Sequence, residues 1–330
     1  MKNAVAQSVW RGLPAKLPYR AGTGCRAGGM LALGLTNGQV MLVDEATGEV
    51  MWAVQAHPAG RACHVAMSPS GKFVASVADK EAHWKLWEAA SGAIHMEGAS
   101  HDGTGACICV DELQNECPAV AHTAILHAVA FAPCGQRFAT GDDAGAVIVW
   151  KTESGEADWK CTSRHVYKIV GRDMAPIVWS LSFSADGARL AGGVRIENIS
   201  VWDVATGELL RTFPPNISPP RFEIISAGHV HFSPADNRML GSAGTEGIVV
   251  WDIDSGERLV RIEDFLEPAS VMFSPDGTTI AAVGMNDDDD DDGMCHMCHV
   301  FNAESLTLRF SMVDNQSDVN AASFSVDPNP

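Results

Sequence analysis

Basic residues are scarce in this chain. Only 23 lysines and arginines stand against 41 aspartates and glutamates among 330 residues, which gives a formal net charge of −18. Binding to the phosphate backbone of a nucleic acid requires a concentrated positive surface. We therefore do not expect a nucleic-acid partner. A protein partner that meets so acidic a chain is expected to be basic.

Long apolar runs are also missing. Residues 1–16 (MKNAVAQSVWRGLPAK) contain no apolar segment of signal-peptide length, and no later stretch approaches the roughly 20 apolar residues of a membrane-spanning helix. We expect a protein without membrane attachment, monomeric or part of a larger complex, and cytoplasmic, with the nucleus as the alternative. The nine cysteines are odd in number and scattered, which indicates reduced thiols in a reducing compartment.

Motifs of catalysis are absent as well. No serine lies in a nucleophile-elbow context, and no paired carboxylate motif of hydrolysis is present. The glycine-containing residues 22–27 (GTGCRA) have neither the preceding apolar strand nor the following helix that dinucleotide binding requires. We expect a protein that is not an enzyme, with no catalytic residue and no cofactor.

The 46% of residues that are hydrophobic follow no sustained helical period. Residues 181–213 (LSFSADGARLAGGVRIENISVWDVATGELLRTF) show the dominant pattern, in which short apolar runs alternate with polar, glycine-containing turns. The four runs are residues 179–183, 188–194, 199–204 and 208–213. They predict a four-stranded antiparallel meander. In the third run Ile199 and Val201 face one side while Trp202 and Val204 face the other, so neighbouring copies must cover both faces.

Two short tags repeat along the chain. The first follows an opening strand, at residues 67–71 (MSPSG), 131–135 (FAPCG), 183–187 (FSADG), 232–236 (FSPAD), 273–277 (FSPDG) and 324–327 (FSVD). The second closes a third strand, at residues 43–44 (VD), 87–88 (WE), 150–151 (WK), 202–203 (WD), 251–252 (WD) and 301–302 (FN). The set resembles the WD-repeat (WD40) β-propeller family from about Met30 onward. The chain departs from the family pattern where Val43 and Phe301 replace the tryptophan, and where the aspartate of the second turn is displaced or missing in several copies.

The resemblance implies an all-β propeller of four-stranded antiparallel blades. Residues 1–28 are expected to form an irregular segment, and residues 29–330 the propeller domain, with an inserted loop at 98–121. The family's histidine before a first strand has counterparts at His57 and His122. The repeat residues expected to have structural roles are Trp87, Trp150, Trp202, Asp203, Trp251, Asp252 and Phe301. Because the first-strand tag at 324–327 has no third-strand tag after it, we expect residues 319–326 to join residues 30–54 in one blade and close a ring of six; seven blades are the alternative.

Family members serve mainly as platforms for protein partners, so the resemblance implies a non-catalytic scaffold. Most intervals between third-strand tags exceed the roughly 40–45 residues of a typical unit. The surplus lies at residues 98–121, 161–177, 214–227 and 286–293, all of which are connections that leave one end of a meander. We expect this loop-rich, acidic face to bind protein.

Cysteine and histidine clusters offer the alternative function, a metal- or haem-binding propeller. Residues 295–299 (CHMCH) match the c-type haem motif, with Cys295, Cys298 and His299 as candidate ligands. On a strand, however, Cys295 and Cys298 point to opposite faces, which favours thiols packed in a blade.

Metal ligands have two further candidate sources. The inserted loop and its flank hold His101, Cys107, Cys109, Cys117 and His122, but without the paired CxxC of a zinc knuckle. Residues 287–292 are consecutive aspartates, of which Asp287, Asp289 and Asp291 are candidates, although one self-repelling arm surrounds a cation poorly. A remote alternative, a quinoprotein-like enzyme, rests only on residues 47–52 (TGEVMW), which are similar to quinoprotein propeller strands.

Overall fold

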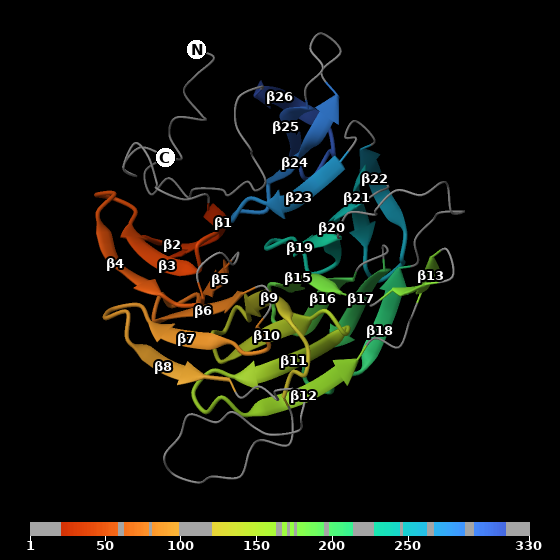
Figure 1. Cartoon of the computed structure of the whole chain (residues 1–330). Helices are drawn as coiled ribbons and strands as arrows, with labels where there is room; N and C mark the ends of the chain where they lie inside the picture. The colour runs from red at the N-terminus through yellow and green to blue at the C-terminus, as the bar shows by residue number, and fades with distance from the viewer. Residues whose placement is uncertain are drawn as a thin grey trace. The chain divides into compact units, whose positions relative to one another are not determined.

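The structure is a computed structural model of the whole chain. It describes residues 21–58, 63–78, 81–98, 121–162, 167–169, 172–174, 177–194, 198–213, 228–244, 247–262, 267–287 and 294–314. These residues form strands and turns and no helix (Figure 1). In this part of the chain there is accordingly no helix with the length and apolar character that a membrane crossing demands. The chain divides into two compact units, residues 1–160 and 161–330.

Three four-stranded antiparallel sheets make up the first unit. The first sheet contains β1 (Ala21–Ala27), β2 (Met30–Leu35), β3 (Gln39–Asp44) and β4 (Val50–Gln55). The second contains β5 (Cys63–Met67), β6 (Phe73–Ala78), β7 (Lys85–Glu88) and β8 (Ile94–Glu97). The third contains β9 (Leu126–Phe131), β10 (Arg137–Asp142), β11 (Ala146–Lys151) and β12 (Ala157–Thr162), whose last residues cross into the second unit. In each sheet the strands lie in chain order, as in a meander.

The second unit repeats this arrangement after a small hairpin of β13 (Tyr167–Ile169) and β14 (Arg172–Met174). Its first four-stranded sheet contains β15 (Val178–Phe183), β16 (Arg189–Val194), β17 (Asn198–Asp203) and β18 (Leu209–Phe213). The next contains β19 (His229–Phe232), β20 (Met239–Gly244), β21 (Gly247–Asp252) and β22 (Arg258–Ile262). The last contains β23 (Glu267–Phe273), β24 (Thr279–Asp287), β25 (Met294–Asn302) and β26 (Leu308–Asp314). The predicted all-β class and the four-stranded antiparallel meander are confirmed.

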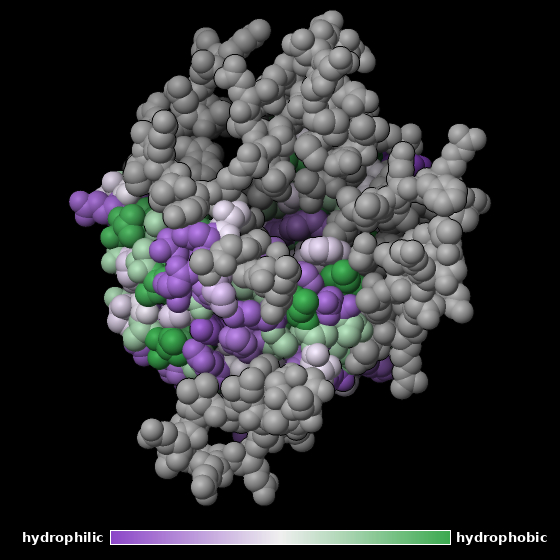
Figure 2. Space-filling view, viewed as in Figure 1, coloured by the Kyte–Doolittle hydropathy of each residue, from purple (hydrophilic) through white to green (hydrophobic). Residues whose placement is uncertain are grey.

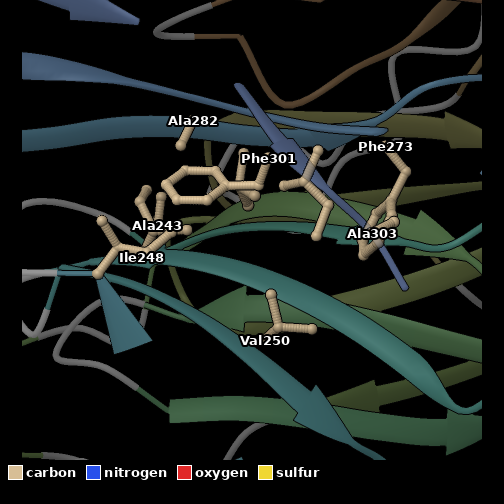
Figure 3. Packing of buried hydrophobic residues seen from close by; sticks show 10 residues of the cluster. Ala243, Ile248, Val250, Phe273, Ala282, Phe301 and Ala303 are labelled. Carbon is tan, nitrogen blue, oxygen red and sulfur yellow. The ribbon is translucent and has the colours of Figure 1, made fainter. Parts of the chain in front are cut away.

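Apolar side chains join consecutive sheets within each unit. In the second unit, a cluster that includes Ala243, Ile248 and Val250 packs against Phe273 and Phe301, and so connects sheet β19–β22 to sheet β23–β26 (Figure 3). In the first unit, Phe73 and Leu86 of sheet β5–β8 pack with Phe138 and Trp150 of sheet β9–β12. Strands in such a stack are covered on both faces, which explains their unbroken apolar runs.

The fourth strand of each sheet differs from the other three. β4 alternates exposed and half-buried residues, whereas β10 and β11 are buried along almost their whole length. The large apolar side chains that remain exposed in the described residues all lie on fourth strands: Val50, Met51, Ile94, Leu209, Leu210, Leu259, Leu308 and Phe310. The fourth strand is therefore the solvent-facing edge of its sheet.

Two predictions about the ends of the repeat are corrected by the strands. Residues 21–27, which we expected to be irregular, form β1 and pair antiparallel with β2 from Ala21 to Ala27. The position beside β2 that we assigned to residues 319–326 is therefore filled from the N-terminal side. The glycines and small residues of 21–27 carry too weak a period-2 pattern to signal a strand, but the ladder offered by β2 satisfies their backbone groups. Residues 319–326 lie outside the described residues, and closure of a ring stays a prediction.

Two predicted loops also contain more regular structure than expected. The hairpin β13–β14 lies within residues 161–177, which we expected to be a plain connection. In the last sheet, β24 and β25 extend to nine residues each and carry the ladder as far as the pair Asp287 and Met294. The aspartates at 288–292 lie outside the described residues.

Candidate functional site

A chain of four buried polar side chains crosses sheet β9–β12. The Trp150 indole Nε1 donates to Thr140 Oγ1 at 2.7 Å, and Thr140 Oγ1 lies 2.7 Å from His122 Nε2. His122 Nδ1 lies 2.7 Å from Asp142 Oδ2. Thr140 is fully buried, and His122 and Asp142 are each about 1% exposed. The chain therefore satisfies every one of these polar groups away from water.

The chemistry of the two ends fixes the direction of the hydrogen bonds. An indole N–H can only donate and an ionised carboxylate can only accept, so Thr140 accepts from Trp150 and donates to His122 Nε2. The proton of the neutral ring is then on Nδ1 and is donated to Asp142. Burial lowers the pKa of His122 and outweighs the hydrogen bond and charge of Asp142, which act to raise it. A neutral histidine is what this directional chain requires.

Asp142 also holds the turn that follows. Its Oδ1 accepts from the backbone N–H groups of Ala144 at 3.0 Å and Ala146 at 2.7 Å. The same carboxylate thus connects the histidine before β9 to the β10–β11 turn. This arrangement anchors the connection at one end of the sheet.

Sheet β5–β8 contains the same chain with a different carboxylate. Trp87 Nε1 donates to Ser76 Oγ at 2.8 Å, and Ser76 Oγ lies 3.0 Å from His57 Nε2. His57 Nδ1 then pairs with the carboxylate of Glu81. Glu81 lies in the β6–β7 connection, three residues beyond the last residue of β6. In the other sheet the carboxylate belongs to Asp142, which is itself the last residue of β10. The displaced acidic residue noted in the sequence is thus replaced in space by a longer side chain from farther along.

The hydroxyl partner of the indole was not identified from the sequence, although a signal exists. The tag tryptophan donates to a hydroxyl group that lies 11, 10 or 9 residues earlier in the chain, in the pairs Ser76–Trp87, Thr140–Trp150 and Ser242–Trp251. The corresponding residue, two positions beyond the register partner of the tag residue, is Gly192 for Trp202, Ala282 for Phe301 and Leu33 for Val43. For Phe301 and Val43, which have no side-chain N–H group, this residue is apolar.

The carboxylate and amide side chains of the third-strand tags cap the turns that follow them. Asp203 Oδ1 accepts from the backbone N–H of Thr206 at 2.8 Å and from its hydroxyl at 2.9 Å. Asp252 Oδ1 accepts from the N–H of Ser255 at 2.8 Å. These hydrogen bonds from Thr206 and Ser255 hold the pKa of each aspartate below its usual value. The Ser-Gly or Thr-Gly of five such turns places glycine at a positive φ, and Leu306 occupies that conformation in the sixth, at φ 55°.

The remaining repeat residues are buried. Trp87, Trp150, Trp202, Trp251 and Phe301 are each less than 9% exposed. Trp202 lies directly against Gly192, where an added Cβ would come within 2.8 Å of the ring atom Cζ3. Gly192 thus gives the indole the space that a hydroxyl residue takes in the other sheets.

The haem-motif residues lie on β25, and the strand gives Cys298 and His299 opposite faces. Cys298 is half-buried, and burial raises the pKa of its thiol, which disfavours the thiolate that binds metals. His299 is buried, and its Nδ1 lies 2.7 Å from Ser311 Oγ. The backbone of Cys295 pairs with Asn286 in the same ladder. Cys298 and His299 are therefore held as parts of the sheet.

The predicted metal ligands of the inserted loop, His101, Cys107, Cys109 and Cys117, lie outside the described residues, as do Asp289 and Asp291. Asp287 ends β24. Both ring nitrogens of His122 are engaged by Thr140 and Asp142, as described above.

A different group of possible metal ligands appears in the structure. The ligand atoms of His57, Glu81 and His83 all lie within 4.8 Å of one another, and it is the one such group found among the described residues. His83 Nε2 lies 3.6 Å from Glu81 Oε2. Sequence reasoning missed it, because the three residues lie in two separate connections and become neighbours only when β5 and β6 pair.

The surface in the view of Figure 2 shows hydrophilic residues with small groups of apolar residues between them. Large continuous apolar patches often mark stable protein interfaces. On the coloured part of this face, such a patch is not seen.

A family profile described as "WD domain, G-beta repeat" matches residues 115–151. This span contains the His122, Thr140, Asp142 and Trp150 of the buried chain. Residues 115–151 therefore match a WD40 repeat. The chain is also similar to the chromatin assembly factor 1 subunit FAS2 homolog of Oryza sativa subsp. japonica, with 28% identity over 122 residues. The match covers 34% of this chain and 23% of that relative, so this chain spans under a quarter of the length of the protein it matches.

Proposed function

We propose that the protein is a non-catalytic interaction scaffold that binds a protein partner through the end of its sheets where the long connections emerge. The observation that carries the proposal is the contrast between the two ends of each four-stranded sheet. Turns between strands one and two and between strands three and four are short throughout the described residues, and the long connections leave the other end. Loops on a rigid framework are where binding is most often located.

The hydrogen bonding of the short turns supports this choice of end. In the β15–β16 turn, Ser184 Oγ accepts from Arg189 N at 2.9 Å and donates to Asp186 at 2.6 Å. Ser274 and Asp276 repeat the pattern in the β23–β24 turn. The polar groups of these turns are satisfied locally, so few remain to recognise a partner.

Charge and the similar protein indicate the kind of partner. The net charge is −18, and the connection sequences include the aspartates at 288–292, so a basic protein surface is the proposed complement. The matching relative is named as a subunit of a chromatin assembly factor. By analogy, we propose a role within a multiprotein assembly and a nuclear location. We also propose that the scaffold is a ring of six blades.

The test removes the connections and leaves the sheets intact. In one variant residues 99–120 are replaced by a short Gly-Ser linker, and in a second the aspartates at 288–292 become asparagines. Tagged proteins are compared by affinity purification and quantitative mass spectrometry from nuclear extract. We expect both variants to lose the partners captured by the parent protein while the thermal unfolding temperature changes little.

A matched control removes negative charge from the other end. Glu208, Glu257 and Glu304 are exposed residues of the third-to-fourth-strand turns, and their replacement by glutamine should leave capture unchanged. If this control loses the same partners as the connection variants, net charge alone governs binding and the proposed face is wrong. If both connection variants capture partners like the parent, the interaction role of this end is also wrong.

A further inference from the structure

We infer that His57, Glu81 and His83 form a binding site for a single Zn²⁺ ion, at the end of sheet β5–β8 where the β6–β7 connection meets the chain entering β5. This goes beyond the interaction role and does not depend on it. The two imidazoles and one carboxylate are the donor set of zinc sites that retain an open coordination position.

The distances suit one shared cation. Zinc binds imidazole nitrogen and carboxylate oxygen at about 2.0–2.2 Å, so two tetrahedral ligands lie roughly 3.3–3.6 Å apart. His83 Nε2 and Glu81 Oε2 are 3.6 Å apart, and all three donor atoms lie within 4.8 Å of one another.

A comparison with the equivalent position in sheet β9–β12 shows how this cluster differs from the buried hydrogen-bond chain. There His122 and Asp142 are each about 1% exposed, and the carboxylate comes from the end of the strand itself. In sheet β5–β8 the carboxylate is supplied by Glu81, whose side chain is 13% exposed, and His83 lies next to it at 29% exposed. The cluster has therefore a third ligand and a solvent-facing side, from which an ion can enter and a water molecule can fill the fourth position.

The ligands are held in place before any metal binds. Coordination through Nδ1 places the ring proton of His57 on Nε2, where it donates to Ser76 Oγ, which also accepts from Trp87. Such outer hydrogen bonds fix the ring and raise metal affinity. The backbone carbonyl of Glu81 accepts from Leu126 N at 2.8 Å, which anchors the connection to the next sheet.

The residue after His83 is equally fixed. Trp84 is 2% exposed and its ring lies edge-on to Phe138 with centroids 4.8 Å apart. His83 thus stands between two anchored positions of a short connection. A site with little freedom to lose binds its ion with a smaller entropy cost.

Lys85 stands near the carboxylate of Glu81 and is itself paired with Glu97 at 3.5 Å, which reduces its repulsion of a bound ion.

The test uses the whole chain and the variant His83→Gln, because His83 lies outside the hydrogen-bond chain that begins at Trp87. Zn²⁺ binding is measured by competition with a chromophoric chelator and by elemental analysis after desalting. We expect the parent to bind one more Zn²⁺ than His83→Gln, or to bind it at least ten-fold more tightly. The matched control is His95→Gln, since His95 is 28% exposed and lies 3.7 Å from Glu88 without a third ligand.

Cobalt substitution separates this site from the cysteines of the chain. Co²⁺ bound by imidazole and carboxylate gives d–d absorption without the sulfur-to-metal charge-transfer bands of thiolate ligands. The variant His83→Cys should keep the metal and gain those bands, which shows that residue 83 is itself a ligand. Equal Zn²⁺ stoichiometry and affinity in the parent and in His83→Gln would overturn the inference, as would His83→Cys without charge-transfer absorption.

Discussion

Replacement of Thr140 by valine tests the buried polar chain most directly. Valine has nearly the same shape and removes only the hydroxyl, which is fully buried and bonded on both sides. The Trp150 N–H and the His122 Nε2 then lose their partner, and a buried polar group without a partner costs about 1–3 kcal/mol. We expect the free energy of unfolding to fall by about 2–6 kcal/mol, the sum for the two groups.

The stability loss expected for Thr140→Val can be compared with that of a variant at Ser242 in the same protein. Ser242 accepts from Trp251 at 2.9 Å, and no histidine joins it in the described residues. The variant Ser242→Ala leaves one buried donor without a partner, so it should cost about half as much as Thr140→Val. The control Thr140→Ser keeps the hydroxyl and should lose only about 1 kcal/mol with the methyl group.

Guanidinium unfolding followed by tryptophan fluorescence measures all three variants. Circular dichroism confirms that each retains its strands before denaturant is added. A loss of less than about 0.5 kcal/mol in Thr140→Val, which is within the range of surface substitutions, would mean that water or another group satisfies His122 and Trp150. The directional hydrogen-bond chain would then be wrong.

Three further perturbations have definite expected outcomes. Burial lowers the pKa of His229 and of His231 to about 4, below the value of about 6.5 in an unfolded chain. Between these two pH values the unfolded chain binds more protons than the folded chain. The free energy of unfolding should therefore be highest above about pH 6.5 and fall by up to roughly 3 kcal/mol per histidine as the pH is lowered to about 4. A free energy of unfolding that stays constant over this pH range would contradict the prediction. Trp202→Ala should cost about 3–5 kcal/mol in denaturant unfolding because it leaves a large cavity, and parent-like stability would refute the close packing of the ring. Gly193→Ala should lower the thermal unfolding temperature by several degrees, since its Cβ would lie 1.7 Å from the Gly228 carbonyl oxygen, whereas an unchanged temperature would show that the two backbones separate easily.

The strands were predictable where the sequence alternates clearly with turn signals. The repeat at 181–213 predicted its four strands to within about one residue at most ends, as β15 (Val178–Phe183) and β16 (Arg189–Val194) show. Small polar turns between short apolar runs leave few other solutions. β1 was missed because its residues, GTGC among them, show neither alternation nor bulk, and its pairing depends on β2.

The polar networks were predictable only in part. The histidines before β5 and β9 were noted, but their carboxylate and hydroxyl partners are distant in sequence. His57 meets Glu81 because β5 and β6 pair, and no local rule relates the two positions. The cluster with His83 follows from the same pairing. Side chains from separate connections can be assigned to one site only when the register of the strands between them is known.

The match between the third-strand tag residue and the second-strand residue that its side chain reaches has a consequence for how such sheets can be altered. A change of Trp150 alone would leave Thr140 with fewer partners, and a change of Thr140 alone would leave an indole N–H without one. Phe301 with Ala282, and Val43 with Leu33, have apolar residues at both positions, and Trp202 is accommodated by Gly192. A sheet grafted from one repeat protein into another should therefore carry both positions together.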